Sequence, residues 1–257
     1  MRKTSIKKIF LPVGKYYCII CSQLLMIINN LILLCKKNAL DLKWKSRLKK
    51  MIKRYGELKL HLGCGDKHYD NMINCDFRAT KAVDIIMDCS NLSRFKENSV
   101  TCIFAHAFFE HIYRSQQLPM LEDCFRILTK NGFLIILGIP DFRVVANWYI
   151  NRNPGIPGYG KIFDLYHVYR YTHGDPEIAP SYWLEQLHKS LFDKEYIKLL
   201  LKKAGFSNYF IFNYCYPKEK IPLLLGLIAS KTKISKSIRA ILEPFKEYIG
   251  DVKDIII

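Results

Sequence analysis

The sequence predicts an α/β fold in which a mostly parallel sheet of about seven strands lies between helices on both faces. Short apolar runs alternate with helical patterns from residue 58 onward, and this alternation is typical of a parallel sheet flanked by helices. Some runs, such as FLIIL at 133–137, are apolar without interruption. Such runs fit strands that are buried on both faces.

The expected strands are short and follow one another along the chain. We expect them at 58–62, 72–75, 83–87, 100–105, 133–137, 209–215 and 223–230, the last of them antiparallel. Helices are expected at 115–128 and 193–204, and Gly205 ends the second.

The predicted main domain spans 51–230. Within it, residues 138–190 are rich in Pro, Gly, Tyr, His and Trp, which predicts an irregular lid over the mouth of the sheet; its aromatic residues would line an acceptor pocket or form a small core of their own. Residues 231–257 predict a C-terminal helix and tail.

The net charge of +17 is concentrated near the N-terminus. Residues 1–59 hold 15 lysines and arginines against 2 acidic residues, whereas residues 60–217 hold 17 against 16. An enzyme of nucleic acids more often carries its basic surface around its site, so this distribution disfavours a nucleic-acid partner but leaves it open. A basic arm beside an apolar segment indicates an anionic membrane surface instead.

Residues 1–50 therefore form a basic amphipathic N-terminal arm in this interpretation. Residues 16–35 carry no charge and are long enough to span a bilayer. Polar residues from Lys15 to Lys37 recur at intervals of seven and would share one face of a helix, which favours a helix lying in the membrane surface, or packed on a partner, over a span. A cleaved signal peptide is disfavoured, because Lys15 interrupts the apolar run. We expect a cytoplasmic protein, attached peripherally to the inner face of the membrane.

The nine cysteines are an odd number and lie mostly inside apolar runs, which fits buried thiols in a reducing compartment. Cys18 and Cys21 have the spacing of a metal or redox pair, but no second pair or neighbouring histidine accompanies them. No metal site is expected from these patterns.

One loop has the residue pattern of a ligand-binding site. The first apolar run ends in Gly63, Cys64 and Gly65, and Asp76 ends the second run. Glycines let the backbone turn tightly beneath a ligand, and an acid after the second strand accepts hydrogen bonds from ribose hydroxyls. The alternative is an ordinary turn followed by a capping acid.

Five segments in order strengthen the first interpretation. They are KLHLGCGDKHYDNMINCD, VDIIMD, ENSVTCIFAHAFFEHI, LEDCFRILTKNGFLIILGIPD and HKSLFDKEYIKLLLKKAGF. This series resembles the class I S-adenosylmethionine-dependent methyltransferases, in particular the small-molecule group called type 11. The resemblance covers about residues 57–215. It implies a Rossmann-like three-layer sandwich and S-adenosyl-L-methionine as cofactor.

The resemblance also implies which residues would bind that cofactor. It assigns Gly63, Cys64 and Gly65 to the methionine part, Asp76 to the ribose, Asp88 and Cys89 to the adenine, and Ala105 and His106 to the region beneath the sulfonium. Two positions depart from the family pattern. His61 stands where many relatives have an acid that contacts the cofactor's amino group, and Lys67 stands where a third glycine is common.

Methyl transfer is an in-line displacement, which depends on aligning the acceptor with the methyl group and excluding water. A hydroxyl acceptor also benefits from a base. Candidate bases are His106, His111 and Asp141, with His173 and His188 in the expected lid. Each has a structural alternative: His106 could shape the pocket, His111 could begin a helix, and Asp141 could cap one.

The expected function is methyl transfer to a small-molecule or cell-envelope acceptor, linked to a sugar or a lipid, at oxygen. One alternative is an RNA or protein methyltransferase recruited by the basic arm. Another is a scaffold protein that binds the cofactor without catalysis, as the departures at His61 and Lys67 suggest.

Deleting residues 1–38 should release the protein from anionic liposomes and preserve cofactor binding, because the arm holds most of the excess charge and lies outside the family resemblance. Each basic residue near an anionic surface contributes about 1 kcal/mol. Liposome co-sedimentation at low and high salt measures this. Equal sedimentation of both forms would contradict the membrane interpretation, and loss of folding would show that the arm belongs to the core.

Overall fold

The computed structural model describes residues 46, 48–54, 56–156, 160–174, 186–217, 219 and 221–256. The chain divides into two compact units, Met1–Arg54 and Tyr55–Ile257. Residues 46 and 48–54 are helical. The apolar segment at 16–35 lies outside the described residues, so the membrane arm stays a prediction. Within the described part of the chain, no helix is long and apolar enough to cross a membrane.

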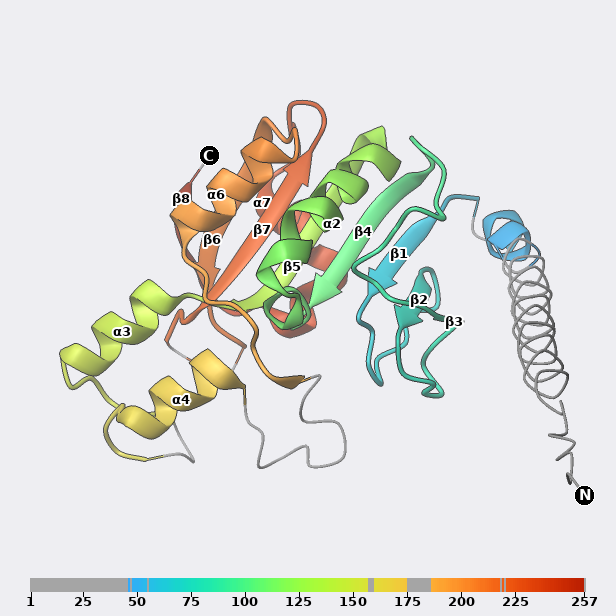
Figure 1. The fold of residues 1–257 in the computed structure, drawn as a ribbon. Helices are drawn as coiled ribbons and strands as arrows, with labels where there is room; N and C mark the ends of the chain where they lie inside the picture. Colours follow the sequence, from blue (N-terminus) through green and yellow to red (C-terminus); the bar gives the residue numbers. More distant parts are fainter. Residues whose placement is uncertain are drawn as a thin grey trace, which may run out of the picture. The chain divides into compact units, whose positions relative to one another are not determined.

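The second unit is built on one sheet of eight strands (Figure 1). The strands are β1 (Lys59–Leu62), β2 (Ile73–Asp76), β3 (Ile85–Ile86), β4 (Val100–His106), β5 (Leu128–Pro140), β6 (Asn208–Tyr214), β7 (Leu224–Ser230) and β8 (Val252–Ile256). Their order across the sheet is β3-β2-β1-β4-β5-β7-β6-β8. The five strands from β3 to β5 pair in parallel, whereas β7 is antiparallel to both of its neighbours and β8 is antiparallel to β6.

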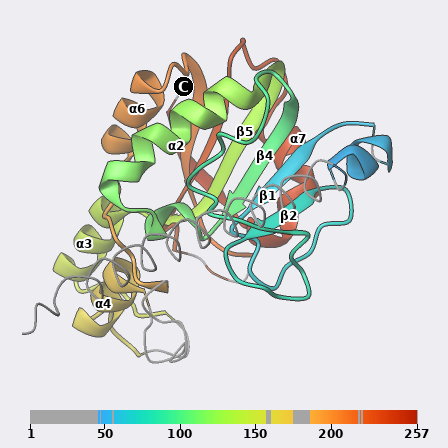
Figure 2. The same ribbon diagram turned by 45° about the vertical axis from the view of Figure 1, so that its right-hand side comes forward.

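Helices cover both faces of this sheet, so the predicted Rossmann-like three-layer sandwich is confirmed. Helices α2 (Arg114–Ile127) and α6 (Lys194–Lys203) lie on one face (Figures 1 and 2). The short helices α7 (Ile238–Leu242) and η2 (Glu243–Tyr248) lie on the other. Asp193 caps α6 by accepting a hydrogen bond from the backbone N–H of Tyr196, and Gly205 follows with φ +98°.

The lid is more regular than the sequence predicts. Residues 138–190 include the end of β5 and two helices, α3 (Phe142–Ile150) and α4 (Leu165–His173). A small apolar cluster of Val145, Ile156, Phe163 and Leu223 packs between them, with Trp148 and Tyr149 against it. In this cluster the aromatic residues of the lid thus form a small core of their own, which is the second of the two roles considered for them. Helical periodicity was obscured because both helices are short and mix aromatic with polar residues.

Two further boundaries differ from the expectation. Strand β5 begins at Leu128, before the expected start at 133, and it includes an irregularity where the register with β4 shifts between Val100 and Cys102. The C-terminal segment is not a free tail, because β8 pairs with β6 at the edge of the sheet. Sheet pairing of this kind depends on a neighbour distant in sequence, which local patterns do not reveal.

The face opposite α2 and α6 is closed by aromatic packing from the C-terminal segment. The ring of Phe245 stacks on that of Phe104 in β4, with centroids 3.8 Å apart, and lies edge-on to Tyr69 at 5.8 Å. Phe245 is 4% exposed and Phe104 is fully buried. Segments about 140 residues apart in the chain thus share one core.

Phe245→Ala should destabilise the fold by about 3–5 kcal/mol, the usual cost of removing a buried phenylalanine ring and leaving a cavity. Urea denaturation followed by circular dichroism measures the loss. Phe142→Ala is the matched control, because Phe142 is 41% exposed and should cost little. Equal stability of the Phe245 variant and the wild type would show that the C-terminal segment is not part of the core.

Candidate functional site

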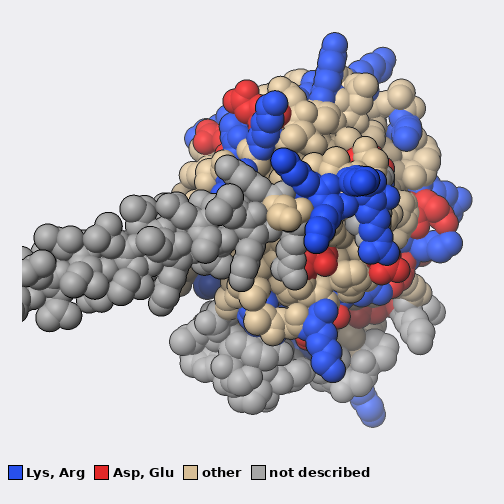
Figure 3. Space-filling view, turned by 90° about the vertical axis from the view of Figure 1, so that its right-hand side faces the viewer, with Lys and Arg blue, Asp and Glu red and all other residues tan. Residues whose placement is uncertain are grey.

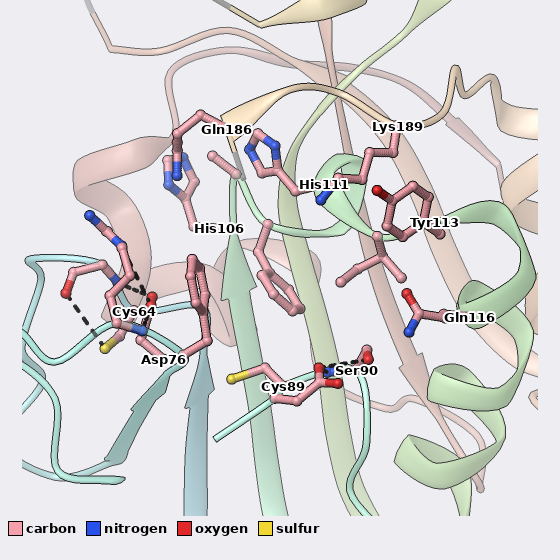
Figure 4. A pocket seen from close by; sticks show the side chains of 18 residues that line it. Cys64, Asp76, Cys89, Ser90, His106, His111, Tyr113, Gln116, Gln186 and Lys189 are labelled. Atoms are coloured by element: carbon pink, nitrogen blue, oxygen red, sulfur yellow. Dashed lines mark hydrogen bonds and ion pairs between the residues drawn. The ribbon is translucent and has the colours of Figure 1, made fainter. Parts of the chain in front are cut away.

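The strand order reverses between β1 and β4, since β2 and β3 lie on one side of β1 and the later strands lie on the other. Open α/β sheets bind ligands at such a reversal, outside the carboxyl ends of the strands. A cavity of about 490 Å³ lies there, within the usual size of small-molecule sites (Figure 4). It is lined by residues 63–65, 76–78, 88–90, 106–108, 111–113, 116, 186 and 189.

The glycine loop after β1 forms one wall of this cavity. Gly63 and Gly65 have φ values of +63° and +55°, in the left-handed region that favours glycine. A side chain on Gly63 would overlap the ring of Phe108, which follows β4. The loop therefore needs a glycine at this position both for its conformation and for the close approach of Phe108.

Asp76 fixes this loop to the end of β2. Its carboxylate accepts hydrogen bonds from the backbone N–H of Gly65, at 2.8 Å, and of Arg78, also at 2.8 Å. The Arg78 guanidinium lies 3.6 Å from the same carboxylate. Asp76 is only 4% exposed, yet it lines the cavity, so its oxygens are held in place at the cavity wall (Figure 4).

Asp88 and Cys89 form the wall that follows β3. The Asp88 carboxylate accepts hydrogen bonds from the backbone N–H and the hydroxyl of Ser90, at 2.9 and 2.7 Å. The turn is thereby fixed. Burial raises the pKa of the Cys89 thiol, so Cys89 offers a neutral, apolar surface to a ligand.

His106 and His111 border the other half of the cavity (Figure 4). The His106 ring stacks on Tyr248 with centroids 3.9 Å apart, and its Nε2 lies 3.3 Å from the Tyr216 hydroxyl. Burial lowers the pKa of His106 to about 4. Burial likewise lowers the pKa of His111 to about 4, so both imidazoles are neutral at neutral pH.

The tautomer of His111 is fixed by its neighbour. Its Nδ1 lies 3.1 Å from the carbonyl oxygen of Leu187, and since a carbonyl can only accept, Nδ1 must carry the proton. The Nε2 lone pair is then available as an acceptor. Of the two cavity histidines, His111 therefore has the better-defined capacity to take a proton.

Besides the lid histidines His173 and His188, three predicted site residues lie outside this cavity. His61 is buried on the opposite face of β1, where its Nδ1 lies 3.1 Å from Asn74 Oδ1 and its ring packs beside Tyr69 and Phe104. Ala105 is fully buried inside β4. Successive strand residues face opposite sides of a sheet. The His61 side chain therefore packs away from the cavity, whereas the loop that follows β1 borders it.

Asp141 is the third, and the structure favours its alternative role as a helix cap. It begins α3, and its carboxylate accepts hydrogen bonds from the backbone N–H of Arg143 at 3.0 Å and from the side chain of Asn213 at 2.8 Å. It lines a separate cavity of about 210 Å³. These contacts account for a buried carboxylate without catalysis.

Several cavity residues were not singled out from the sequence. They are Phe77, Arg78, Ser90, Ala107, Phe108, Ile112, Tyr113, Gln116, Gln186 and Lys189. Most follow a predicted motif by one to five positions, so their proximity to the motif was the available signal. Gln186 and Lys189 come from the lid and had no such signal.

A glycine loop, a buried acid after the second strand and a cavity at the strand reversal define a nucleotide-type cofactor site in an α/β enzyme. Residues 67–136 match the family described as a methyltransferase domain. This part of the chain is thus similar to methyltransferases, in agreement with the resemblance to the class I S-adenosylmethionine-dependent enzymes.

Two solved structures illustrate the similarity. A methyltransferase from Archaeoglobus fulgidus, described as SAM-dependent, is 16% identical with a TM-score of 0.42, over 74% of this chain and 93% of that chain. The second is the 1,6-didemethyltoxoflavin-N1-methyltransferase of Burkholderia thailandensis, bound to 1,6-didemethyltoxoflavin and S-adenosylhomocysteine. It is 12% identical with a TM-score of 0.42, over 89% of this chain and 94% of that chain. Comparison with curated proteins gave no match. These likenesses carry no conclusion about the acceptor.

Asp76→Ala should weaken binding of S-adenosylmethionine about tenfold or more, because charge-assisted hydrogen bonds contribute about 1.5–3 kcal/mol. Titration calorimetry measures the affinity. Asp88→Ala tests the adenine end, and Asp66→Ala, in the exposed loop, is the matched control. Unchanged affinity in a folded Asp76 variant would refute the ribose assignment.

His106→Gln should gain stability relative to the wild type as the pH falls from 6.5 towards 4. In that window the unfolded chain protonates His106 while the folded protein keeps it neutral, so the wild type loses stability with falling pH. The difference should reach on the order of 2–3 kcal/mol. Urea titrations at several pH values give the comparison, and a difference that does not vary with pH would contradict the buried neutral imidazole.

Proposed function

We propose that this chain transfers the methyl group of S-adenosylmethionine to a hydroxyl oxygen of a small-molecule acceptor, of the sugar- or lipid-linked kind found in cell envelopes. The observation that carries the proposal is the continuity of the cavity. The glycine loop, Asp76 and Cys89 border one half, and His106, His111 and Lys189 border the other. The first half suits the cofactor and the second suits an acceptor.

The chemistry of transfer sets what the second half must do. The acceptor oxygen attacks the methyl carbon as the carbon–sulfur bond breaks, and the hydroxyl proton must leave. Neutral His111, with its Nε2 lone pair available, is the group we assign to accept that proton. The Phe108 ring and the buried Cys89 exclude water around the sulfonium.

The polar side chains of the second half favour a polar acceptor. Gln116, Gln186 and Lys189 offer donors and Tyr113 offers a ring with a hydroxyl. Such a set suits the hydroxyls of a sugar and the negative charge of a phosphate-linked lipid.

An RNA acceptor is the less favoured candidate. The described surface in Figure 3 shows basic side chains interspersed with acidic ones, and residues 60–217 are nearly neutral overall. A nucleic-acid site would gather positive charge around the cavity. Salt-dependent RNA binding by the N-terminal residues would favour this candidate instead.

The two halves of the cavity should respond separately to mutation. Tyr113→Ala should raise the KM for the acceptor while the affinity for S-adenosylmethionine stays as in the wild type, because Tyr113 lies at the far end of the cavity from Asp76 (Figure 4). Gly63→Val should abolish both cofactor binding and methyl transfer, since the valine side chain would overlap Phe108.

The measurement is methyl transfer from radiolabelled cofactor to a panel of sugars, glycolipids and lipid-linked phosphates, beside titration calorimetry with the cofactor alone. Transfer to a member of the panel, with the product mapped to an oxygen, supports the proposal. Cofactor binding by the wild type with transfer only to RNA or protein would overturn the acceptor class. Absence of cofactor binding would overturn the proposed function as a whole.

A further inference from the structure

A buried carboxylate lies beside the cavity without a compensating charge. Glu110, in η1 (Phe109–His111), is 2% exposed, and its Oε2 has no hydrogen-bond partner among the described residues. Within the same part of the chain, no lysine or arginine forms an ion pair with it. The ammonium of Lys189 lies over the Tyr113 ring instead, 4.7 Å from its centroid. A buried side-chain oxygen without a hydrogen-bond partner is rare in proteins and calls for an explanation.

Two histidines face this carboxyl group. The Nε2 of His111 lies 3.8 Å from Glu110 Oε1. The ring of His188, from the end of the lid, lies across from His111 with centroids 5.1 Å apart. One ligand atom from each of the three side chains can be chosen so that all lie within 4.8 Å of one another.

Both histidines are held in the orientation of metal ligands. His111 donates Nδ1–H to the carbonyl of Leu187, and His188 donates Nδ1–H to the carbonyl of Tyr171, at 2.9 Å. Metal-binding histidines almost always donate their other ring N–H in this way, which fixes the tautomer and leaves Nε2 free.

Backbone contacts hold the three elements together. The N–H of Lys189 donates to the carbonyl of Glu110 at 2.8 Å, and the N–H of His188 donates to the carbonyl of His173 at 3.1 Å. The end of α4, the segment 186–190 and η1 therefore meet at one point. His111 of this cluster lines the cavity, as do the neighbouring lid residues Gln186 and Lys189 (Figure 4).

We infer that Glu110, His111 and His188 bind a divalent transition-metal ion, with zinc the best match to the donor set. Two imidazoles and one carboxylate, with an open position left over, form the ligand set of catalytic zinc and of related metals. Ligand atoms around zinc lie roughly 3.3 Å apart, given bonds of about 2.0–2.1 Å, so binding draws the three side chains slightly closer than they are here.

This inference rests on the proposed function and changes the role of His111 from proton acceptor to metal ligand. Of the three ligands His111 lines the cavity, and we assign the open position to the acceptor. A hydroxyl bound there loses its proton to water more readily, because the cation stabilises the alkoxide. The alkoxide oxygen then attacks the methyl carbon, and the carbon–sulfur bond breaks.

The test uses the full chain stripped of metal by a chelator and then titrated with Co²⁺ and with Zn²⁺. We expect one equivalent to bind to this site, with a visible Co²⁺ spectrum that lacks a thiolate charge-transfer band. The spectrum matters because the nine cysteines offer competing ligands, which such a band would reveal.

Glu110→Gln and His188→Gln should each weaken this binding about tenfold or more. His173→Gln should bind as the wild type does, since the exposed His173 ring lies outside the cluster. His188 is only partly buried, so its variant keeps the test valid if the Glu110 variant fails to fold. Metal binding that both substitutions leave unchanged, or binding through thiolates alone, would overturn the inference.

Titration of S-adenosylmethionine in parallel separates this inference from the proposed function. Cofactor binding without metal binding overturns the metal site and leaves methyl transfer standing. Metal binding that depends on Glu110, without cofactor binding, overturns the proposed function and leaves the metal site standing.

Discussion

The reversal of strand order between β1 and β4 is the constraint on which the rest of the site depends. Neighbouring parallel strands end at the same edge of the sheet, and at the reversal their following loops diverge to opposite sides. The space between them becomes the cavity. Asp76 then fixes the glycine loop through the N–H of Gly65, and Phe108 closes the loop's far side because Gly63 has no side chain. The cofactor half of the site is thus built from backbone geometry with few side chains.

The acceptor half depends on a different kind of contact, made by segments far away in the chain. The backbone bond from Lys189 to Glu110 brings the end of the lid onto the helix that follows β4. His106 is supported in a similar way by Tyr216 and Tyr248, both beyond β6. This half therefore forms only when the lid and the C-terminal segment have packed. Relatives with the same cofactor loop but a different lid would keep the cofactor and change the acceptor.

The sequence by itself determined seven of the eight strands, the helices α2 and α6, and the glycine loop that ends with the acid after β2. Uninterrupted apolar runs, caps such as Asp193 and the spacing from Gly63 to Asp76 are local signals, and the residues that carry them lie close together in the chain. Local sequence was sufficient because the loop, the turn and the acid are each specified within about fifteen residues.

Only the tertiary structure decided which way His61 points, that Asp141 caps a helix, and that β8 completes the sheet. Each depends on strand register or on a partner distant in sequence, and one position of register turns a strand side chain to the other face. The same reason applies to the cluster of Glu110, His111 and His188. The first two are adjacent in sequence, but His188 reaches them only through lid packing, so no local spacing could reveal the set.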